Sequence, residues 1–453
     1  MKISIQFLVN LFFVMLSIAY CVMAPNVYNL VFCQIVALTY VVHNVSYFAL
    51  LDRKNWLGFE LFFCLSFFFV NYVYPVFIYP IFPNFAVFSY AFELNIVPKA
   101  TAIAYLGYSC YLLGCTSLND DSRKENVGEG FKVTHMQLNI ALVMVLFFFV
   151  CYILTGGLAA MRSVYADGGD INEVGLYSYF KLLFTISSYL LAVFTFKLEG
   201  KTKWWYVASL VMIMFMMLTT GSRTLVIGLS LIMIVSFNNN VRKIRLIEFA
   251  VIVVVGVLVL YSIMLGRGEQ ADTDISSVVD SSDVGWLEAF LDLIVNNRNL
   301  YVLVDYASSH PFTFFHGMLV DLTAPIPGVS SMLVAVFNEP IELLHGGMLP
   351  TYLEFGTGSS YGLGTNMVGE AYRSFGYPGT AIMMFAIGYI VRKTYYLGKS
   401  NMYMYMLYYL LVSHSIMYTR GPIIMDLRLI TWTMALLYIT TCDIRIVRKE
   451  AKK

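Results

Sequence analysis

The sequence predicts an all-α polytopic integral membrane protein, with about twelve transmembrane helices and one large extracytoplasmic loop that contains helices. Three observations support this class. Of the 453 residues, 59% are hydrophobic and only 13% are charged, whereas soluble domains are about half apolar and about a quarter charged. Apolar stretches of membrane-spanning length recur along the chain. Basic residues gather between alternate stretches, as the positive-inside rule requires.

Twelve stretches are predicted to be spans, because each offers a run close to the roughly 20 apolar residues that a transmembrane helix needs. They are 4–24, 28–51, 56–80, 101–117, 137–160, 175–196, 204–220, 223–237, 247–266, 376–391, 401–418 and 421–441. The stretch 101–117 is short and holds several polar residues, so it is the weakest of the set. The stretches 204–220 and 223–237 nearly touch, which predicts a tight hairpin that turns at Arg223.

The distribution of charge then sets the topology and divides the chain. With residue 1 inside, the seven inside segments are all basic and together hold 20 of the 29 lysines and arginines, as expected for cytoplasmic loops. Both termini are therefore predicted to be cytoplasmic. The predicted parts are nine N-terminal transmembrane helices over 1–266, the large outer loop over 267–375, and three C-terminal helices with a basic tail over 376–453.

The outer loop has a character of its own. Residues 267–355 contain twelve acidic residues and only two arginines. Apolar residues recur at helical spacing over 284–310, which predicts a helix at the membrane surface that carries Arg298. The apolar, proline-broken segment 314–336 is predicted to dip into the membrane, and the glycine-rich segment 355–379 leads into the next span.

The nine basic residues outside the inside segments are mostly arginines, seven against two lysines. Charge at membrane depth is costly and indicates function, and the arginine fork matches the oxygens of phosphate. Six arginines are therefore predicted to bind an anionic, lipid-linked pyrophosphate: Arg223, Arg267, Arg298, Arg373, Arg420 and Arg428. Arg420 and Arg428, if on one helix, lie roughly 80° apart and are expected to face one cavity. The alternative is that these arginines reach lipid headgroups or pair with carboxylates such as Asp426.

Candidate general bases are few. Glu370 precedes Arg373 by three residues, so both lie on one side of a predicted helix. Asp321 and His316 lie in the apolar part of the outer loop, and a carboxylate or imidazole there is suited to take a proton from a sugar hydroxyl. The alternative for Glu370 is a salt bridge to Arg373. The sequence contains no P-loop, no HExxH and no Cys/His ligand spacing, so neither a metal ion nor a cofactor is predicted.

From about residue 135 to 440 the chain resembles the Wzy-type O-antigen polymerases, which polymerise the oligosaccharide repeat units of bacterial envelopes. The features that carry the resemblance are the Gly-Ser-Arg turn at 221–223, Arg267 after the next span, the loop helix with Arg298, HGMLVDLTAPIPG at 316–328, the glycine-rich run 362–379, and Thr-Arg-Gly at 419–421 before Arg428.

The resemblance implies a membrane-embedded glycosyltransferase of lipopolysaccharide biosynthesis. Such an enzyme moves the growing glycan from undecaprenyl pyrophosphate to a new lipid-linked repeat unit, at the periplasmic face of the bacterial inner membrane. The reaction is expected to invert the anomeric carbon and to need no metal, with a flippase and a chain-length regulator as partners and no nucleic acid. Two alternatives remain: an O-antigen ligase that uses the same donor, and a flippase or transporter of lipid-linked oligosaccharides.

Overall fold

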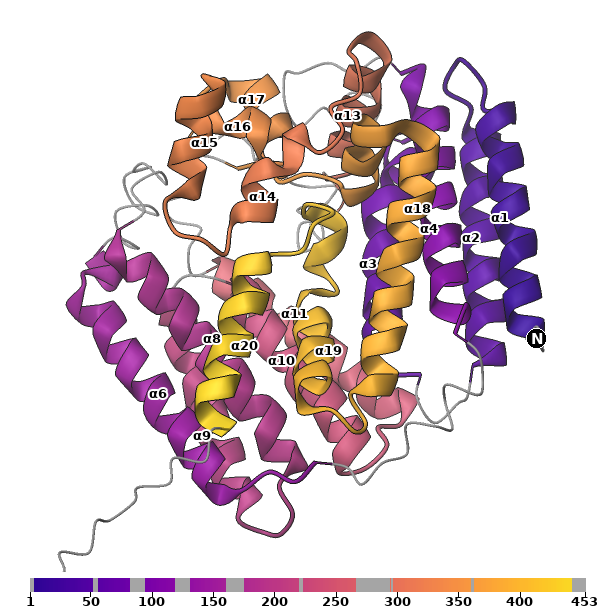
Figure 1. The fold of residues 1–453 in the computed structure, drawn as a ribbon. Coiled ribbons are helices and arrows are strands. Elements are labelled where there is room, and N and C mark those ends of the chain that lie inside the picture. The colour runs from indigo at the N-terminus through magenta and orange to yellow at the C-terminus, as the bar shows by residue number, and fades with distance from the viewer. Residues whose placement is uncertain are drawn as a thin grey trace, which may run out of the picture.

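The computed structural model describes residues 4–51, 56–81, 94–118, 131–159, 175–219, 223–265, 294, 296–359 and 362–441, and over these ranges the regular secondary structure is entirely helical (Figure 1). The N-terminal elements are α1 (Ile5–Met23), α2 (Leu30–Leu50), α3 (Phe59–Asn71), η2 (Tyr74–Ile78) and α4 (Ile96–Thr116). Next come α6 (His135–Leu154), α8 (Leu176–Lys197), α9 (Lys203–Thr219), α10 (Arg223–Asn240) and α11 (Leu246–Leu265).

The second half of the chain begins with short helices and ends with long ones. The short elements are α13 (Asn297–Ser309), η3 (His316–Met318), α14 (Leu319–Thr323), α15 (Val329–Phe337), α16 (Ile341–Leu344) and α17 (Leu349–Phe355). The C-terminal elements are α18 (Met367–Leu397), α19 (Met402–His414), η4 (Met417–Arg420) and α20 (Leu427–Thr441). Figure 1 shows the short helices together at one end of the bundle, and the α8–α9 and α18–α19 turns at the other.

The chain is a helical, multi-pass membrane protein. Five helices are long and apolar enough to cross a bilayer, namely α1, α2, α6, α8 and α18. Shorter apolar helices are found at Phe59–Asn71, Lys203–Leu218, Thr224–Asn240, Leu246–Gly256 and Leu427–Thr441. Large apolar side chains such as Phe12, Val31 and Phe147 are exposed on the outer helices, which is expected where lipid is the solvent. The total of about twelve spans remains a prediction.

The weakest predicted span, 101–117, is part of the helix α4, which packs between α18 and the pair α1 and α2 (Figure 1). α4 is longer than predicted because it begins at Ile96, and nearly all of its side chains are buried. Its polar residues make hydrogen bonds to other helices: Ser109 to Ser17 at 2.9 Å, and Thr116 with the amide of Asn10 at 3.0 Å. Because protein rather than lipid surrounds α4, its low hydropathy is no obstacle to its place in the bundle.

α4 packs closely against α18 through glycines. A side-chain Cβ at Gly114 would lie 2.1 Å from the carbonyl oxygen of Phe385, and one at Gly388 would lie 2.0 Å from that of Tyr111. Membrane helices approach this closely only where small residues face each other. The pair of glycines therefore fixes the part of α18 that follows Gly376 closely against α4.

α18 consists of two helical segments that meet at a kink. The backbone of Gly376 is non-helical, with φ 68°, so one segment runs from Met367 to the kink and the other runs from the kink to Leu397. The second segment begins where the sequence predicts the start of the span 376–391. Pro378 has no N–H for the carbonyl of Ser374, and the N–H of Phe314 donates to that carbonyl instead, at 2.9 Å. The carbonyl of Arg373 accepts from the N–H of Thr313 at 3.3 Å. The outer-loop segment is thereby joined to the kink.

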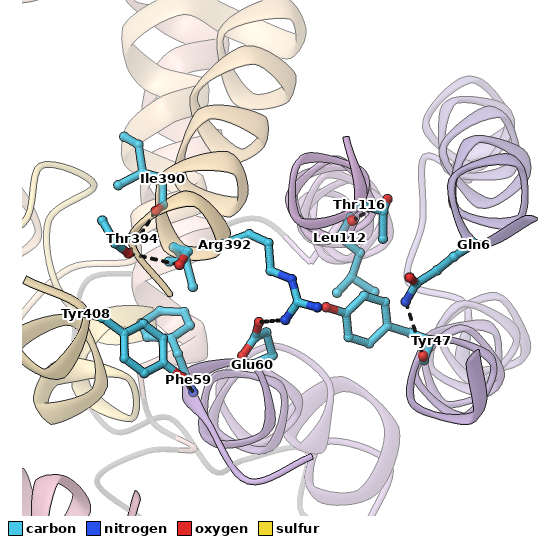
Figure 2. Close-up of polar contacts among 11 residues, drawn as sticks. Gln6, Tyr47, Phe59, Glu60, Leu112, Thr116, Ile390, Arg392, Thr394 and Tyr408 are labelled. Carbon is cyan, nitrogen blue, oxygen red and sulfur yellow. Dashed lines mark hydrogen bonds and ion pairs between the residues drawn. The ribbon is translucent and has the colours of Figure 1, made fainter. Parts of the chain in front are cut away.

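Arg392 is buried, although it lies one residue beyond the predicted span 376–391 and counts among the basic residues of the inside segments. It lies within α18, and its Nη1 is 3.3 Å from Oε1 of Glu60 in the first turn of α3. Figure 2 shows its guanidinium pointing toward Glu60 and Tyr47. Both partners are less than a tenth exposed, so Arg392 serves as half of a buried ion pair between two helices.

The last predicted span begins later than expected. Arg420 ends η4, and α20 begins only at Leu427, after Asp426, whose side chain accepts a hydrogen bond from the N–H of Leu429 at 3.1 Å. Arg420 and Arg428 therefore do not share one helix, and the expected angle of roughly 80° between them is wrong. The loop helix predicted over 284–310 is described as α13 from Asn297, and it ends before Pro311 as expected.

Candidate functional site

Two charged residues of the first turns of α18 lie at the centre of a buried polar cluster. Glu370 is 0% exposed and Arg373 is 2% exposed. The start of this helix is fixed by Asn366, whose side-chain oxygen accepts hydrogen bonds from the N–H groups of Val368 and Gly369. The amide of Asn366 in turn donates to the side chain of Asn71, at 3.0 Å. The capping residue thus ties the site to the N-terminal half of the bundle.

The carboxylate of Glu370 is only half satisfied. Its Oε2 accepts a hydrogen bond of 2.7 Å from the N–H of Ile423, in the turn before α20. Its Oε1 is buried and has no hydrogen-bond partner within the described residues. Since such a group carries a large desolvation cost, this oxygen is available to accept a proton or a hydrogen bond from a ligand.

Arg373, like Glu370, has buried side-chain atoms that no described residue satisfies. Its Nε and Nη2 are buried and have no hydrogen-bond partner in the part of the chain that the structure describes. Glu370 and Arg373 interact electrostatically, yet these two described side chains do not form the salt bridge that was the alternative expectation. The cluster therefore presents a carboxylate oxygen and guanidinium donors that are not consumed by each other.

Two glycines make room for these charged groups. A Cβ at Gly346 would lie 1.9 Å from Oε1 of Glu370, and a Cβ at Gly317 would lie 1.9 Å from Nη2 of Arg373. Any side chain at either position would displace the charged group. The loop segments that follow α16 and begin η3 thus form the surface against which α18 presents its two charges.

Asp321 and His345 complete the cluster. Asp321 is buried, and its Oδ2 accepts a hydrogen bond of 2.8 Å from the N–H of Gly346. Its Oδ1 lies 3.5 Å from Nδ1 of His345, whose side chain is 30% exposed. Exposure therefore decreases from His345 through Asp321 to Glu370, with Gly346 in contact with both carboxylates. This order suits a route for a proton between the outside and the buried Glu370.

Burial also changes the acidity of Asp321. It raises the pKa of the Asp321 carboxyl above its ordinary value, while the nearby His345 and the N–H of Gly346 act in the opposite direction. A carboxyl with a raised pKa is a stronger proton acceptor when ionised, as acid–base chemistry near neutral pH requires. Asp321 also interacts electrostatically with Glu370, so the two carboxylates share one environment.

Comparison with known proteins identifies the family. A family model described as O-antigen polysaccharide polymerase Wzy matches residues 3–449, nearly the whole chain. The chain belongs to the Wzy family. No curated protein and no solved structure matches it. The resemblance inferred from the sequence is thus confirmed, and the chain has the role of an O-antigen polymerase, a glycosyltransferase-like enzyme that acts on lipid-linked oligosaccharide repeat units in a membrane.

Of the three bases predicted for this Wzy-family chain, the structure brings Glu370 and Asp321 together and places His316 in another environment. Nε2 of His316 lies 2.8 Å from Oε2 of Glu339, and both side chains are more than a third exposed. The next residue, Gly317, is the one that contacts Arg373. His316 is thus next to Gly317 in sequence, but its ion-pair partner is Glu339 and not a residue of the Glu370 cluster.

The six predicted arginines differ in their surroundings. Arg298 is buried and forms an ion pair with Glu354 of α17, so its charge is already compensated. Arg428 is half-buried, and its Nε has no hydrogen-bond partner among the described residues. Arg420 is half-buried at the end of η4. The side chain of Arg223 and all of Arg267 lie outside the described residues.

Several site residues were not identified from the sequence. Gly346 and Gly317 carry no chemistry of their own, and their role follows from close approach to Glu370 and Arg373. His345 is one of several outer-loop histidines, but it alone is followed by a pair of glycines, which is a signal for a tight backbone approach. Within the described residues, no group of three or more His, Cys, Asp or Glu side chains is arranged to hold a metal ion.

Proposed function

We propose that this chain polymerises O-antigen by transferring the growing glycan from undecaprenyl pyrophosphate to a sugar hydroxyl of a new lipid-linked repeat unit, at the periplasmic face of the bacterial inner membrane. The observation that supports this most is the cluster of Glu370, Arg373 and Asp321, which places ionisable groups with unsatisfied atoms beside the short helices of the predicted outer loop. Family membership supplies the polymerase role.

The proposed reaction breaks the bond between the anomeric carbon and the pyrophosphate oxygen and forms a bond to the acceptor oxygen. Glu370 accepts the proton of the attacking hydroxyl, and Asp321 with His345 passes that proton outward. The pyrophosphate leaves still attached to its lipid. Attack from the opposite face inverts the anomeric carbon.

Arginine supports the departure of the leaving group. Arg373 offers guanidinium donors in a buried setting, where fixed charge stabilises a developing anion far more than in water. Arg428, with a buried Nε that is also unsatisfied within the described residues, and Arg420, Arg223 and Arg267 are proposed to complete the pyrophosphate site. Because these cations supply the compensating charge, the transfer is proposed to proceed without a metal ion. Arg298 is proposed to position α13 through Glu354.

Both termini are proposed to be cytoplasmic, which places the short helices α13–α17 in the periplasm. A flippase is proposed to deliver lipid-linked units to that face, and a chain-length regulator to set the length of the product. The one alternative class that the site also suits is ligase, since a ligase uses the same donor and needs the same base and leaving-group chemistry.

The test uses the surface glycan of a strain that lacks this protein, resolved as a ladder on a gel. Wild type is expected to restore the ladder, whereas Glu370→Gln and Arg373→Gln are expected to leave the lipid core with a single repeat unit. Loss of a general base costs about 10² to 10⁴ in rate, so no intermediate ladder is expected. Glu199→Gln and Arg242→Gln, at exposed positions, are the matched controls.

Other outcomes would contradict the proposal. A bare core with long lipid-linked polymer would indicate a ligase, and a bare core with single units held on the cytoplasmic face would indicate a flippase. A full ladder from Glu370→Gln, with expression equal to wild type, would exclude this carboxylate as the base. Arg373→Lys is expected to remain defective, because lysine keeps the charge but lacks the arginine fork.

A further inference from the structure

A second polar site lies at the opposite end of the bundle from Glu370. A cavity of about 340 Å³ lies between the ends of α8 and α10 and the α18–α19 turn. Figure 1 shows these helix ends and this turn at the opposite end of the bundle from the short helices α13–α17. Among the described residues the cavity lining includes Lys197, Lys243 and Lys399 and no acidic side chain. The ammonium groups of Lys197 and Lys399 repel each other across this small volume, and an anion between them would relieve that repulsion.

Two of these lysines form cation–π contacts with aromatic rings. Nζ of Lys197 lies 4.9 Å from the ring centre of Phe131 and 5.3 Å from that of Tyr405. Nζ of Lys399 lies 5.6 Å from the ring centre of Tyr395. A ring face orients an ammonium group but does not neutralise it. Neither lysine forms an ion pair with a carboxylate within the described residues, so no such contact compensates a positive charge at the cavity.

The cavity wall is a fixed hydrogen-bonded network. The amide of Asn240 donates to the hydroxyl of Tyr405 at 2.8 Å, and that hydroxyl donates to Tyr409 at 3.4 Å. The amide of Asn239 also donates to Tyr409, at 3.3 Å. Gly398 allows the end of α18 to lie against α19, because a Cβ there would be 2.9 Å from the Cα of Tyr405. The polar wall is thus held before any ligand arrives.

The position of the cavity relates it to the membrane surface. Trp204 and Trp205 follow Lys197 across the α8–α9 turn and are 52% and 79% exposed. Tryptophans concentrate at the headgroup level of a bilayer, where their rings meet both lipid and water. The cavity therefore lies at the depth of lipid phosphates on this side of the membrane.

We propose that this cavity binds a phosphate group, supplied by the headgroup of an anionic phospholipid of the leaflet opposite the candidate active site. Lysine is a point-charge binder of phosphate, and amide and hydroxyl groups complete the polar surroundings. The volume lies at the lower end of the range for small-ligand sites, which suits a single headgroup. The proposal is independent of the polymerase reaction, because none of its residues belongs to the Glu370 cluster.

The test measures binding to the purified full-length protein in detergent, by native mass spectrometry with added lipid and by thermal unfolding. Phosphatidylglycerol is expected to bind and to raise the unfolding temperature, whereas phosphatidylcholine is not. The variant Lys197→Gln/Lys399→Gln is expected to bind phosphatidylglycerol about 25-fold more weakly, since each lysine near an anionic lipid contributes about fivefold. The matched control, Lys201→Gln/Lys393→Gln, loses the same two charges at positions outside the cavity lining and is expected to bind as wild type does.

The remaining arms separate the sources of the phosphate. If inorganic phosphate alone binds with the same dependence on Lys197 and Lys399, the phosphate site stands and its ligand is a free anion. Equal affinities of the two double variants would overturn the proposal, as would equal binding of phosphatidylcholine. Should the Lys197→Gln/Lys399→Gln variant fail to fold, Lys243→Gln, at an exposed lining position, is expected to weaken binding about fivefold. Unchanged affinity of that variant would equally overturn the proposal.

Discussion

Replacing Gly346 with alanine is a direct test of the contact between the loop and Glu370. The new Cβ would lie 1.9 Å from Oε1 and 2.5 Å from Cδ of Glu370, whereas ordinary contacts begin at 3.4 Å. The carboxylate or the loop must therefore move by about 1.5 Å, the difference between 3.4 Å and 1.9 Å. The hydrogen bond of 2.7 Å from the N–H of Ile423 cannot survive a displacement of that size by the carboxylate.

The expected loss can be estimated from this displacement. Misplacing a reacting group by about 1 Å costs roughly 10²-fold in rate, so Gly346→Ala is expected to lower the rate of polymerisation about 100-fold. Overpacking also costs about 1–3 kcal/mol of unfolding free energy, which thermal unfolding in detergent will register. The rate is measured with purified protein and lipid-linked repeat units, as the lengthening of product on a gel.

Gly362 provides the matched control. A Cβ at Gly362 meets no atom within 4 Å, so Gly362→Ala is expected to polymerise at the wild-type rate. Shortening the neighbour offers a second check, because Glu370→Asp withdraws the carboxylate from Gly346. In the double variant Gly346→Ala/Glu370→Asp, the loss of rate, expressed as an activation free energy, should be much smaller than the sum of the losses of the two single variants. Additive losses, or a Gly346→Ala rate equal to that of Gly362→Ala, would refute the contact.

Three further predictions concern stability. Arg392→Met or Glu60→Gln leaves one buried charge without its partner and should lower the unfolding free energy by about 3–5 kcal/mol. The double variant should recover much of this loss, as measured by thermal unfolding. Gly388→Ala places a Cβ 2.0 Å from a backbone oxygen of α4 and should lower the unfolding free energy by about 1–3 kcal/mol or more. Gly256→Ala, which meets nothing within 4 Å, should lower it far less. Because burial raises the pKa of Asp321, the folded state binds its proton more tightly than the unfolded state. The unfolding free energy of wild type relative to Asp321→Asn should therefore fall as the pH rises above about 4, and a constant difference from pH 4 to pH 8 would contradict this.

The apolar pattern predicted most helices because lipid imposes a simple constraint on composition. The side of a helix that faces lipid must be apolar, and the large exposed side chains of α1 and α6, such as Phe12 and Phe147, follow this rule. The pattern fails where protein replaces lipid. α4 is polar enough to look like a weak span, yet nearly all of its side chains are buried, and Ser109, Thr116 and Tyr108 form hydrogen bonds with neighbouring helices.

Helix boundaries in the C-terminal third depended on contacts distant in sequence. Gly376 and Pro378 read as the start of a span, because each interrupts a helix locally. In the structure the helix does break at Gly376, and the N–H groups of Thr313 and Phe314 donate to the carbonyls of Arg373 and Ser374 beside the break. Glu370 therefore lies in the segment before the break, which these hydrogen bonds join to the outer-loop segment.

The same limit applies to the arginines on which the functional prediction rested. The excess of arginine over lysine among the outward residues suggested a special role, but it could not distinguish a substrate ligand from a structural ion pair. That distinction depends on whether a carboxylate lies within reach. Arg298 meets Glu354 from 56 residues away, and Arg392 meets Glu60 from 332 residues away. Arg373 has a carboxylate three positions before it, and the structure directs that carboxylate to the N–H of Ile423 instead. An arginine would therefore be available to the proposed pyrophosphate only where a distant backbone or side-chain group occupies the nearest acid. Arg373 meets this condition, and Arg298 does not.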